Sequence, residues 1–262
     1  MQAPPRLSIV IPAYNEQARI LGSLKAAEAY LLKAEEAAEI VVVDDGSGDG
    51  TAEMVERFAR DRPQGGPVSA RLLRNGRNRG KGYSIKHGVL MALGDLVLIS
   101  DADFSTPIDE LPVLRQAVEN EGYGIAIGSR GLEASRVEIH QAAWREMMGR
   151  GFNALVRLLT GLPFRDTQCG FKLARRQEVL PLFRAARVER FAWDVEILYL
   201  ARKAGVRVRE VPVLWRNAAG TKVNALIDPF DMLKDIARVL VRDRLGRYGR
   251  LGARPEGGDA RT

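Results

Sequence analysis

Residues 96–107 read LVLISDADFSTP and join a run of aliphatic residues to two aspartates. The aliphatic residues 96–99 predict a strand that is buried on both faces, as strands of a parallel sheet are. Asp101 and Asp103 follow directly, and two carboxylates at the end of a buried strand are costly unless a partner balances their charge. Side chains two apart on an extended strand point the same way, so we expect both to converge on one Mg²⁺ or Mn²⁺ ion. The alternative is an exposed acidic turn before Pro107.

The same layout, an apolar run followed by a polar cluster, recurs along the first half of the chain. The clusters are PAYNE at 12–16, DDGS at 44–47, DAD at 101–103 and GSR at 128–130. Helical patterns separate these strands, which predicts an α/β fold with a doubly wound, mostly parallel, Rossmann-like sheet. Ligands of such sheets bind at the carboxyl ends of the strands, where the clusters fall.

The expected elements follow from the apolar periodicity. Strands are expected over 7–11, 40–43, 71–73, 96–100, 124–128 and 206–214, and helices over 19–32, 51–60, 81–93, 109–120, 140–160, 193–204 and 228–242. We expect a catalytic domain over 1–227, an amphipathic helix over 228–245 and a disordered Gly- and Arg-rich tail over 246–262. Two interpretations of the amphipathic helix stay open: it lies on a membrane surface, or it packs on the sheet.

Composition limits the classes of partner and cofactor. The net charge is +7, and eight lysines among 40 basic residues leave 32 arginines, which favour phosphates and anionic membrane surfaces. Nucleic-acid binding is disfavoured, because aromatic residues make up only 6% of the chain and no basic run is interleaved with them. The single cysteine, Cys169, excludes an internal disulfide and fits a cytoplasmic location.

Two further motifs lie between a strand and a helix. In VVVDDGSGDGT, residues 41–51, Asp44 can accept hydrogen bonds from a base or ribose, although an acidic turn that caps a helix has the same pattern. In NRGKG, residues 78–82, Lys81 and two glycines precede a helix, which is an arrangement suited to phosphate. The spacing of a Walker loop is absent.

Together these segments resemble glycosyltransferase family 2, whose members have the GT-A fold. The series SIVIPAYNE, VVVDDGSGDGT, NRGKG, SDAD, IGSR, DTQCGFK and FAWDVEILYLARKAGVRVREVPVLW covers roughly residues 6–243. The last three segments are shared with the branch that transfers sugars to polyprenyl or dolichyl phosphate. The motifs DADFSTP and NRGKG are most similar to the glucosyl-transferring members of that branch.

The resemblance implies roles for individual residues. Donor binding would use Pro12, Tyr14, Glu16, Asp44, Asp45, Lys81 and Asp101. Asp101 and Asp103 would hold the metal, Asp103 and Asp166 would be catalytic, and Arg130, Arg145 and Arg150 would bind the acceptor phosphate. Whether Asp166 is a base or a positioning residue stays open, because a phosphate acceptor is already anionic at neutral pH.

The implied activity is inverting transfer of a hexose, glucose from UDP-glucose, to a polyprenyl or dolichyl monophosphate. The partners would be the nucleotide sugar, the lipid phosphate and, by peripheral contact, the cytoplasmic face of a membrane; a homodimer is left open. Three alternatives remain: a GDP-mannose-dependent enzyme of the same branch, a family 2 enzyme with a soluble hydroxyl acceptor, and a nucleotidyltransferase or non-catalytic nucleotide-binding module.

Overall fold

The computed structural model describes residues 4–63, 65–139, 143–216, 228–249 and 251. Strands and helices alternate through the first half of the chain, as the apolar periodicity predicts. The elements there are β1 (Leu7–Ala13), α1 (Ile20–Lys33), β2 (Ala38–Asp44), α2 (Thr51–Arg60), β3 (Val68–Arg74), α3 (Lys81–Met91), β4 (Leu96–Ile99), η1 (Ile108–Glu110), α4 (Leu111–Arg115), η2 (Gln116–Asn120) and β5 (Ile125–Ser129).

The second half is less regular. It contains β6 (Arg136–Ile139), α5 (Ala143–Thr160), β7 (Lys172–Arg175), α6 (Arg176–Ala185), α7 (Trp193–Lys203), β8 (Val208–Pro212), β9 (Leu214–Arg216) and α8 (Asp228–Arg244). The strand expected over 206–214 is divided at Val213 into β8 and β9, which belong to different sheets. Strands β6 and β7 and helix α6 were not expected from the sequence.

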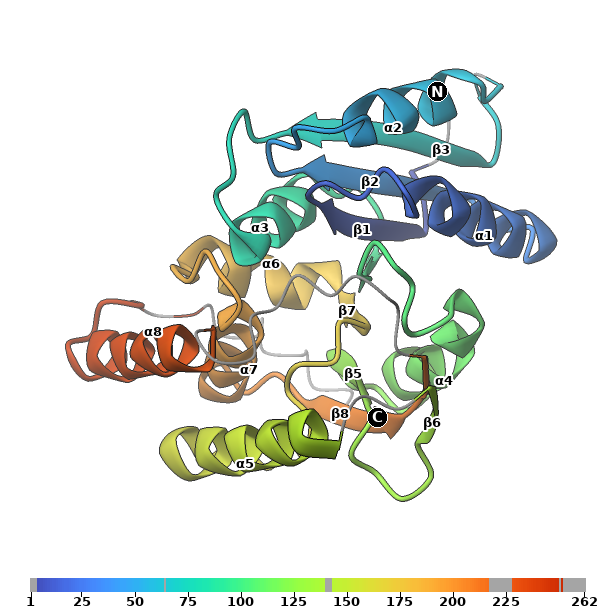
Figure 1. The fold of residues 1–262 in the computed structure, drawn as a ribbon. Coiled ribbons are helices and arrows are strands. Elements are labelled where there is room, and N and C mark those ends of the chain that lie inside the picture. Colours follow the sequence, from blue (N-terminus) through green and yellow to red (C-terminus); the bar gives the residue numbers. More distant parts are fainter. Residues whose placement is uncertain (1–3, 64, 140–142, 217–227, 250, 252–262) are drawn as a thin grey trace, which may run out of the picture.

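The central sheet has the strand order β3-β2-β1-β4-β7-β5-β8 (Figure 1). All neighbouring strands run parallel except β7, which is antiparallel to both β4 and β5. The predicted mostly parallel α/β sheet is therefore confirmed. Because β7 runs against its neighbours, the loop that enters it lies at the edge where the other strands end.

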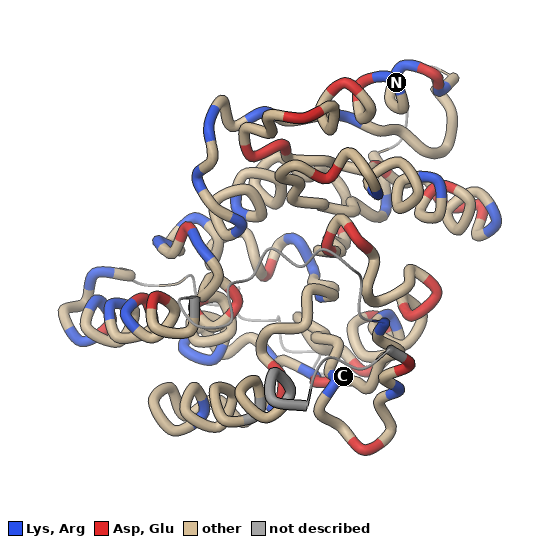
Figure 2. The backbone as a smooth tube through the Cα atoms, viewed as in Figure 1, with Lys and Arg blue, Asp and Glu red and all other residues tan. Residues whose placement is uncertain are grey.

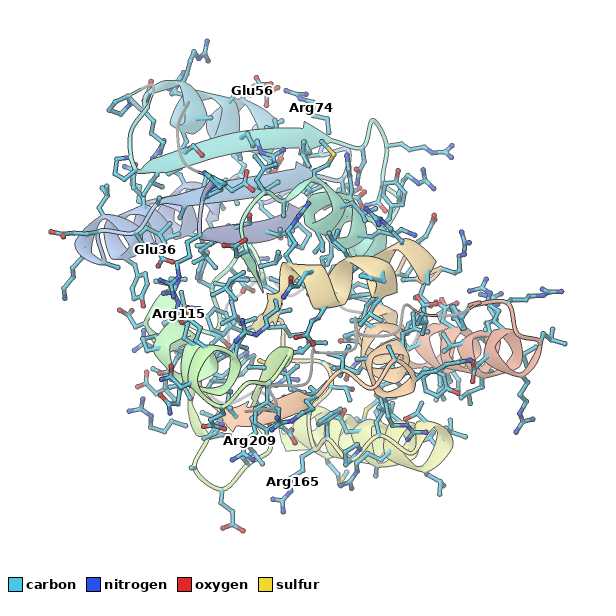
Figure 3. The ribbon with its side chains drawn as sticks, turned by 180° about the vertical axis from the view of Figure 1, so that it is seen from behind. Glu36, Glu56, Arg74, Arg115, Arg165 and Arg209 are labelled. Atoms are coloured by element: carbon cyan, nitrogen blue, oxygen red, sulfur yellow. The ribbon has the colours of Figure 1, made fainter. Side chains whose placement is uncertain are left out.

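Alternate residues of the central strands contribute to two separate cores. Ile9 and Ile11 of β1 pack with α1, α2 and α4, whereas Val10 packs with α3, α6 and α7 on the opposite face. This alternation is the period of two that a strand covered on both faces requires. Between the helices of the first face, Arg115 of α4 donates to Glu36 at 2.5 Å (Figure 3).

Helix α8 packs into the second core rather than standing apart from it. Ile236 and Val239 are fully buried, and α8 lies against α5 and α7 (Figure 1). After the helix, the Tyr248 hydroxyl donates to Glu196 of α7 at 2.5 Å, so this part of the expected tail is docked; residues 252–262 lie outside the described residues. Helix α8 therefore buries its apolar side against protein, which is the arrangement that the packed interpretation describes.

Within the described residues, no helix is long and apolar enough to cross a membrane.

Candidate active site

The loops that follow β1 and β2 are joined by reciprocal hydrogen bonds. The Asn15 amide donates to Ser47 Oγ at 2.9 Å, and the Gly48 amide donates to Asn15 Oδ1 at 2.8 Å. The Glu16 amide donates to Thr51 Oγ1 at 2.7 Å, at the start of α2. Asn15 has a φ of 52°, a left-handed conformation that asparagine tolerates well. These contacts make the two loops one rigid wall of the site.

Three of the predicted donor residues lie along this wall. Pro12 is in β1 and half-buried, Tyr14 is 38% exposed just past the strand, and Glu16 is buried. The Glu16 carboxylate accepts from Arg19, with Nη2 at 3.0 Å from Oε1. A flat ring such as a nucleotide base could lie against the exposed Tyr14 side chain.

The two adjacent aspartates at the end of β2 have different surroundings. Asp44 is buried, and in the described part of the chain its carboxylate accepts only long hydrogen bonds, from the Ser47 amide at 3.3 and 3.4 Å. Asp45 accepts from Asn75 Nδ2 at 2.7 Å, from the Arg79 amide at 3.0 Å and from the Gly80 amide at 2.8 Å. Asp45 therefore fixes the loop before α3, while the oxygens of Asp44 retain capacity for a ligand.

That loop ends at Lys81, the first residue of α3, and places its side chain beside Asp101. Lys81 Nζ lies 2.6 Å from Asp101 Oδ1. Burial raises the pKa of Asp101, but the charges of Lys81, Lys172 and Arg130 outweigh it and lower that pKa below its ordinary value. Burial lowers the pKa of Lys81, and Asp101 with its neighbouring carboxylates raises it overall. Both groups are therefore charged at neutral pH.

The two aspartates of the opening motif meet in a turn, not on an extended strand. Strand β4 ends at Ile99, and the Phe104 amide donates to the Asp101 carbonyl at 3.1 Å. Phe104 has a φ of 44°, and Asp103 Oδ1 accepts from the Ser105 amide at 3.0 Å. The expectation that strand alternation aligns the carboxylates is wrong, because the strand stops two residues before Asp101.

The residues of this turn fit a hard divalent cation. Carboxylate oxygens are the ligands that Mg²⁺ and Mn²⁺ prefer, and such ions commonly keep waters or substrate phosphates in the rest of their shell. Asp101 Oδ1 is buried, and among the described residues Lys81 Nζ, at 2.6 Å, is its one polar partner. No group of three or more His, Cys, Asp or Glu residues in the described part of the chain could complete the shell. Asp101 and Asp103 would therefore share the ion with the substrate.

The loop that enters β7 packs directly on this turn. A Cβ atom at Gly170 would lie 2.2 Å from Asp101 Oδ2, so any other residue there would displace that carboxylate. Lys172, buried in β7, donates to the Cys169 carbonyl and holds the loop from inside. Lys172 also lies near Asp194, at the start of α7, whose pKa is raised by burial to about 6. The antiparallel strand thus brings a second half of the chain against the aspartate turn.

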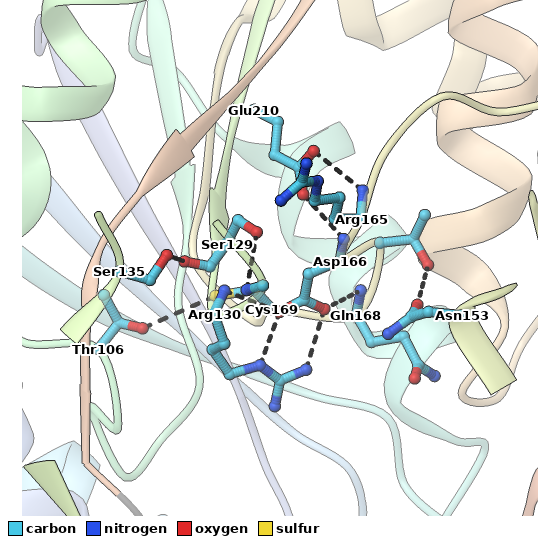
Figure 4. A network of polar contacts seen from close by, with 12 residues as sticks. Thr106, Ser129, Arg130, Ser135, Asn153, Arg165, Asp166, Gln168, Cys169 and Glu210 are labelled. Atoms are coloured by element: carbon cyan, nitrogen blue, oxygen red, sulfur yellow. Dashed lines mark hydrogen bonds and ion pairs between the residues drawn. The ribbon is translucent and has the colours of Figure 1, made fainter. Parts of the chain in front are cut away.

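The same loop carries Asp166, which is paired with Arg130 (Figure 4). Arg130 Nε lies 2.7 Å from Asp166 Oδ2, and Nη2 lies 3.0 Å from Oδ1. The amides of Arg130 and Gln168 donate to the same carboxylate, each at 3.1 Å. Burial raises the pKa of Asp166, but Arg130 outweighs burial and lowers it to about 2. Asp166 is therefore ionised, and each of its carboxylate oxygens already accepts two hydrogen bonds.

Arg130 also lines a pocket of about 580 Å³. Asn153 and Arg157 of α5 and Arg165 of the β7 loop form other parts of its wall. Figure 3 shows the Arg165 side chain pointing outward from the body of the protein. Neither Arg157 nor Arg165 was predicted as a site residue. The predicted Arg145 and Arg150 fall within α5, but their side chains lie outside the described residues.

Several residues of the site were not predicted from the sequence, and the reason is the same for each. Arg19, Gly170, Lys172 and Asp194 acquire their positions from contacts between segments that are distant along the chain. The glycine of DTQCGFK was the one available signal, since a glycine between a polar loop and a strand often marks a close approach of backbone.

Comparison with known proteins gives consistent matches. The family model described as glycosyl transferase family 2 matches residues 8–179. A dolichyl-phosphate beta-glucosyltransferase of Dictyostelium discoideum is 36% identical over 92% of this chain and 75% of its own length. Enzymes of the same name from Saccharomyces cerevisiae and Homo sapiens are 33% and 31% identical, over 92% and 93% of this chain and 76% and 77% of their own lengths.

Solved structures share the fold at lower identity. Mannosyl-3-phosphoglycerate synthase from Rubrobacter xylanophilus matches with a TM-score of 0.67 and 22% identity, over 96% of this chain and 78% of its own. Glucosyl-3-phosphoglycerate synthase from Mycobacterium tuberculosis, in a complex with UDP, matches with a TM-score of 0.65 and 19% identity, over 97% and 82%. Another structure of the latter enzyme contains Mn²⁺, UDP-glucose and phosphoglyceric acid.

Proposed function

The chain belongs to glycosyltransferase family 2, and on that premise we propose that it transfers glucose from UDP-glucose to dolichyl or polyprenyl monophosphate, with inversion at the sugar carbon. The dolichyl-phosphate beta-glucosyltransferases compared above support the proposal, because they are 31% to 36% identical over more than nine tenths of this chain. They are also matched over about three quarters of their own length.

The observation that carries the proposal is the pairing of Asp166 with Arg130. A carboxylate with a pKa of about 2, and four hydrogen bonds to its two oxygens, is a poor proton acceptor. An alcohol acceptor needs a base, whereas a phosphomonoester with a second pKa of about 6 is mostly a dianion at pH 7. A phosphate acceptor therefore suits this site, and Asp166 acts by holding Arg130 in place.

On the donor side, the residues bind and orient the nucleotide sugar. Asp44 has acceptor capacity for the ribose or base, and Tyr14, the residue after the Ala13 that pairs with Asp44, is exposed. Lys81 stands at the amino end of α3, where helix-terminal amides and its own charge favour a phosphate group. When bound by Asp101 and Asp103, a divalent ion supplies charge neutralisation for the departing UDP. Assays with each metal in turn decide between Mg²⁺ and Mn²⁺.

On the acceptor side, the pocket beside Arg130 supplies positive charge. Arg157 and Arg165 line it from two different elements, and Asn153 adds a polar group. Arginine binds phosphate through paired N–H groups, so these side chains can bring an anionic acceptor close to an anionic donor. Arg145 and Arg150 stay part of the proposal on the strength of the family resemblance.

A lipid acceptor requires access from a membrane, and α5 has a surface that fits one. Among the side chains that the structure describes, its large exposed apolar ones are Met147, Met148, Leu155, Leu158 and Leu159. Helical spacing places all of them within one third of the helix circumference. Figure 2 shows α5 mostly uncharged beside α8, which carries several basic residues. We propose that this apolar face of α5 rests in the interface of the cytoplasmic leaflet, next to the pocket that α5 lines.

The proposed activity is tested by incubating the purified protein with Mg²⁺ or Mn²⁺, labelled UDP-glucose and polyprenyl phosphate, followed by lipid extraction. We expect label in the organic phase with UDP-glucose, loss of that signal with EDTA, and recovery when metal is added back. Labelled GDP-mannose is run in parallel. Label transferred only from GDP-mannose would replace the donor, and no lipid label from any donor would overturn the proposal.

A further inference from the structure

The aspartate turn is approached by two basic side chains from different helices. Lys81 Nζ, at the start of α3, lies 2.6 Å from Asp101 Oδ1. Arg19, the residue just before α1, places Nη1 at 3.7 Å from Asp103 Oδ2. Each candidate metal ligand therefore has its own positive neighbour. The family motif accounts for Lys81, but no role has been given to Arg19.

Arg19 is held in this position by the wall of the nucleotide site. Its Nε and Nη2 donate to the two carboxylate oxygens of Glu16, with Nη2 at 3.0 Å from Oε1. Glu16 is buried and its amide is bound to Thr51, so the guanidinium is fixed on one edge. The distance to Asp103 is longer than a hydrogen bond, so that contact is a charge attraction across the turn. The Nη1 edge thus faces the place where metal and diphosphate would meet.

The charges of this group of side chains favour binding of the metal together with the nucleotide over binding of the metal alone. Lys81 and Arg19 face three carboxylates, Asp101, Asp103 and Glu16, so a divalent cation arriving alone changes the net charge of this group from −1 to +1. The diphosphate of a sugar nucleotide carries one negative charge on each phosphate, and together with the cation it leaves the balance unchanged. Metal and nucleotide are therefore accepted as a pair, and the two basic side chains become available to the phosphates.

We propose that Arg19 is a diphosphate-binding residue that also opposes metal binding in the absence of nucleotide. The inference rests on the proposed use of a nucleotide-sugar donor, but it does not depend on the sugar or on the acceptor. Its chemical content is specific: one guanidinium, fixed by Glu16, exchanges an attraction to Asp103 for charge-assisted hydrogen bonds to a phosphate oxygen.

The test compares the full chain with Arg19→Gln, which keeps a side-chain donor toward Glu16 but removes the charge. Binding of Mn²⁺ alone is measured from the electron paramagnetic resonance signal of the free ion, and binding of UDP by calorimetry at saturating Mn²⁺. We expect Arg19→Gln to bind Mn²⁺ alone as much as about fivefold more tightly, since a competing, partly exposed charge is gone. We expect UDP to bind at least about tenfold more weakly, since a charge-assisted bond is lost.

Two further variants separate this role from general effects. Lys33→Met removes one charge from the exposed far end of α1 and should change neither affinity. Arg19→Lys keeps a charge but loses the guanidinium fork, so its affinity for Mn²⁺ alone should lie between those of the parent and of Arg19→Gln. Circular dichroism melting of each variant checks that the chain is folded.

Weaker Mn²⁺ binding in Arg19→Gln would mean that Arg19 only holds Asp103 in place, and would overturn the proposal. Unchanged UDP binding would overturn it as well. Because neither measurement contains glucose or lipid, failure here is distinguishable from failure of the proposed transfer reaction.

Discussion

The guanidinium of Arg130 grips both carboxylate oxygens of Asp166, with Nε at 2.7 Å from Oδ2 and Nη2 at 3.0 Å from Oδ1. The pair joins the end of β5 to the loop before β7 (Figure 4). Two segments that are 36 residues apart in sequence are thereby held in one geometry at the acceptor side of the site.

Substituting Asp166 by Asn should therefore impair acceptor binding more than the chemical step. Arg130 would lose a charge-assisted partner, which is worth about a tenfold to hundredfold change in affinity. We expect a raised KM for polyprenyl phosphate, measurable residual turnover, and an unchanged pH profile of kcat between about pH 6 and 8, because no base is lost. Turnover at the level of the enzyme-free reaction, with normal acceptor binding, would instead identify Asp166 as a base.

A side chain at Gly170 should disturb the position of Asp101. A Cβ there would lie 2.2 Å from Asp101 Oδ2, so Gly170→Ala must displace that carboxylate. We expect Mn²⁺ affinity in the presence of UDP to fall about tenfold or more, because one of two protein ligands moves. Gly22→Ala is the matched control, since a Cβ at Gly22, in α1, meets nothing within 4 Å. Equal metal affinity in both variants would show that the turn can shift freely.

Asp44 and Asp45 should respond differently to the same substitution. In Asp45→Asn the amide oxygen can still accept from Asn75 and Arg79, but the new NH2 group opposes the Gly80 amide, so the free energy of unfolding should fall by about 1–3 kcal/mol. Asp44→Asn loses only the long contacts to Ser47 and should keep near-parental stability while its KM for the nucleotide sugar rises. Urea unfolding and donor titration separate the two; equal loss of stability would mean that Asp44 is structural as well.

Asp194 makes stability depend on pH in a defined direction. Burial raises its pKa from 3.8 to about 6. A carboxyl whose pKa is higher in the folded chain stabilises the fold below about pH 4, and that contribution is lost as the pH rises to about 6. Asp194→Asn stays neutral, so it should exceed the parent in unfolding free energy by up to about 3 kcal/mol at pH 7.

That advantage of Asp194→Asn should shrink toward zero at pH 4. Urea titrations at several pH values measure the two free energies side by side. A difference that is constant with pH would show that Asp194 keeps an ordinary pKa in the folded chain.

The apolar face of α5 should bind vesicles. Met147 and Leu158 are 70% and 81% exposed, and replacing both by Gln removes the largest apolar surfaces of that face. Burying one such side chain contributes about 1.5–3 kcal/mol, so cosedimentation with anionic vesicles should weaken at least about tenfold. Leu93→Gln is the control, because Leu93 is 60% exposed but follows α3. Equal sedimentation of both variants would remove α5 as the membrane contact.

The sequence was most informative where local pattern and function coincide. Asp44, Lys81 and Asp101 could be placed at one edge, because buried runs precede them and parallel strands end together. The orientation of Asp101 and Asp103 could not, because a four-residue strand gives no sign of where it stops and a turn begins. Arg130 was predicted for the acceptor, but its attachment to Asp166 depends on a contact across the sheet.

The antiparallel strand was beyond local pattern for the same reason. Residues 172–175 read KLAR, which has neither a long apolar run nor strict alternation. Lys172 is nevertheless buried there, since its ammonium is satisfied by the Cys169 carbonyl and nearby carboxylates. A lysine can be buried in a short strand only because residues distant in sequence satisfy its charge, and a single sequence does not show those contacts.

The reversed direction of β7 has a consequence for how such enzymes can diversify. All residues that we assign to the donor precede residue 105, and all residues that we assign to the acceptor follow it. The loop that enters β7 brings acceptor residues to the sheet edge where the donor residues lie, because β7 begins at that edge. The two halves are joined by the pairing of β4 with β7 and by both hydrophobic cores, and at the site Gly170 lies tightly against Asp101. Exchange of the segment from 130 to 169 could therefore redirect the enzyme to a new acceptor while its nucleotide specificity is inherited intact.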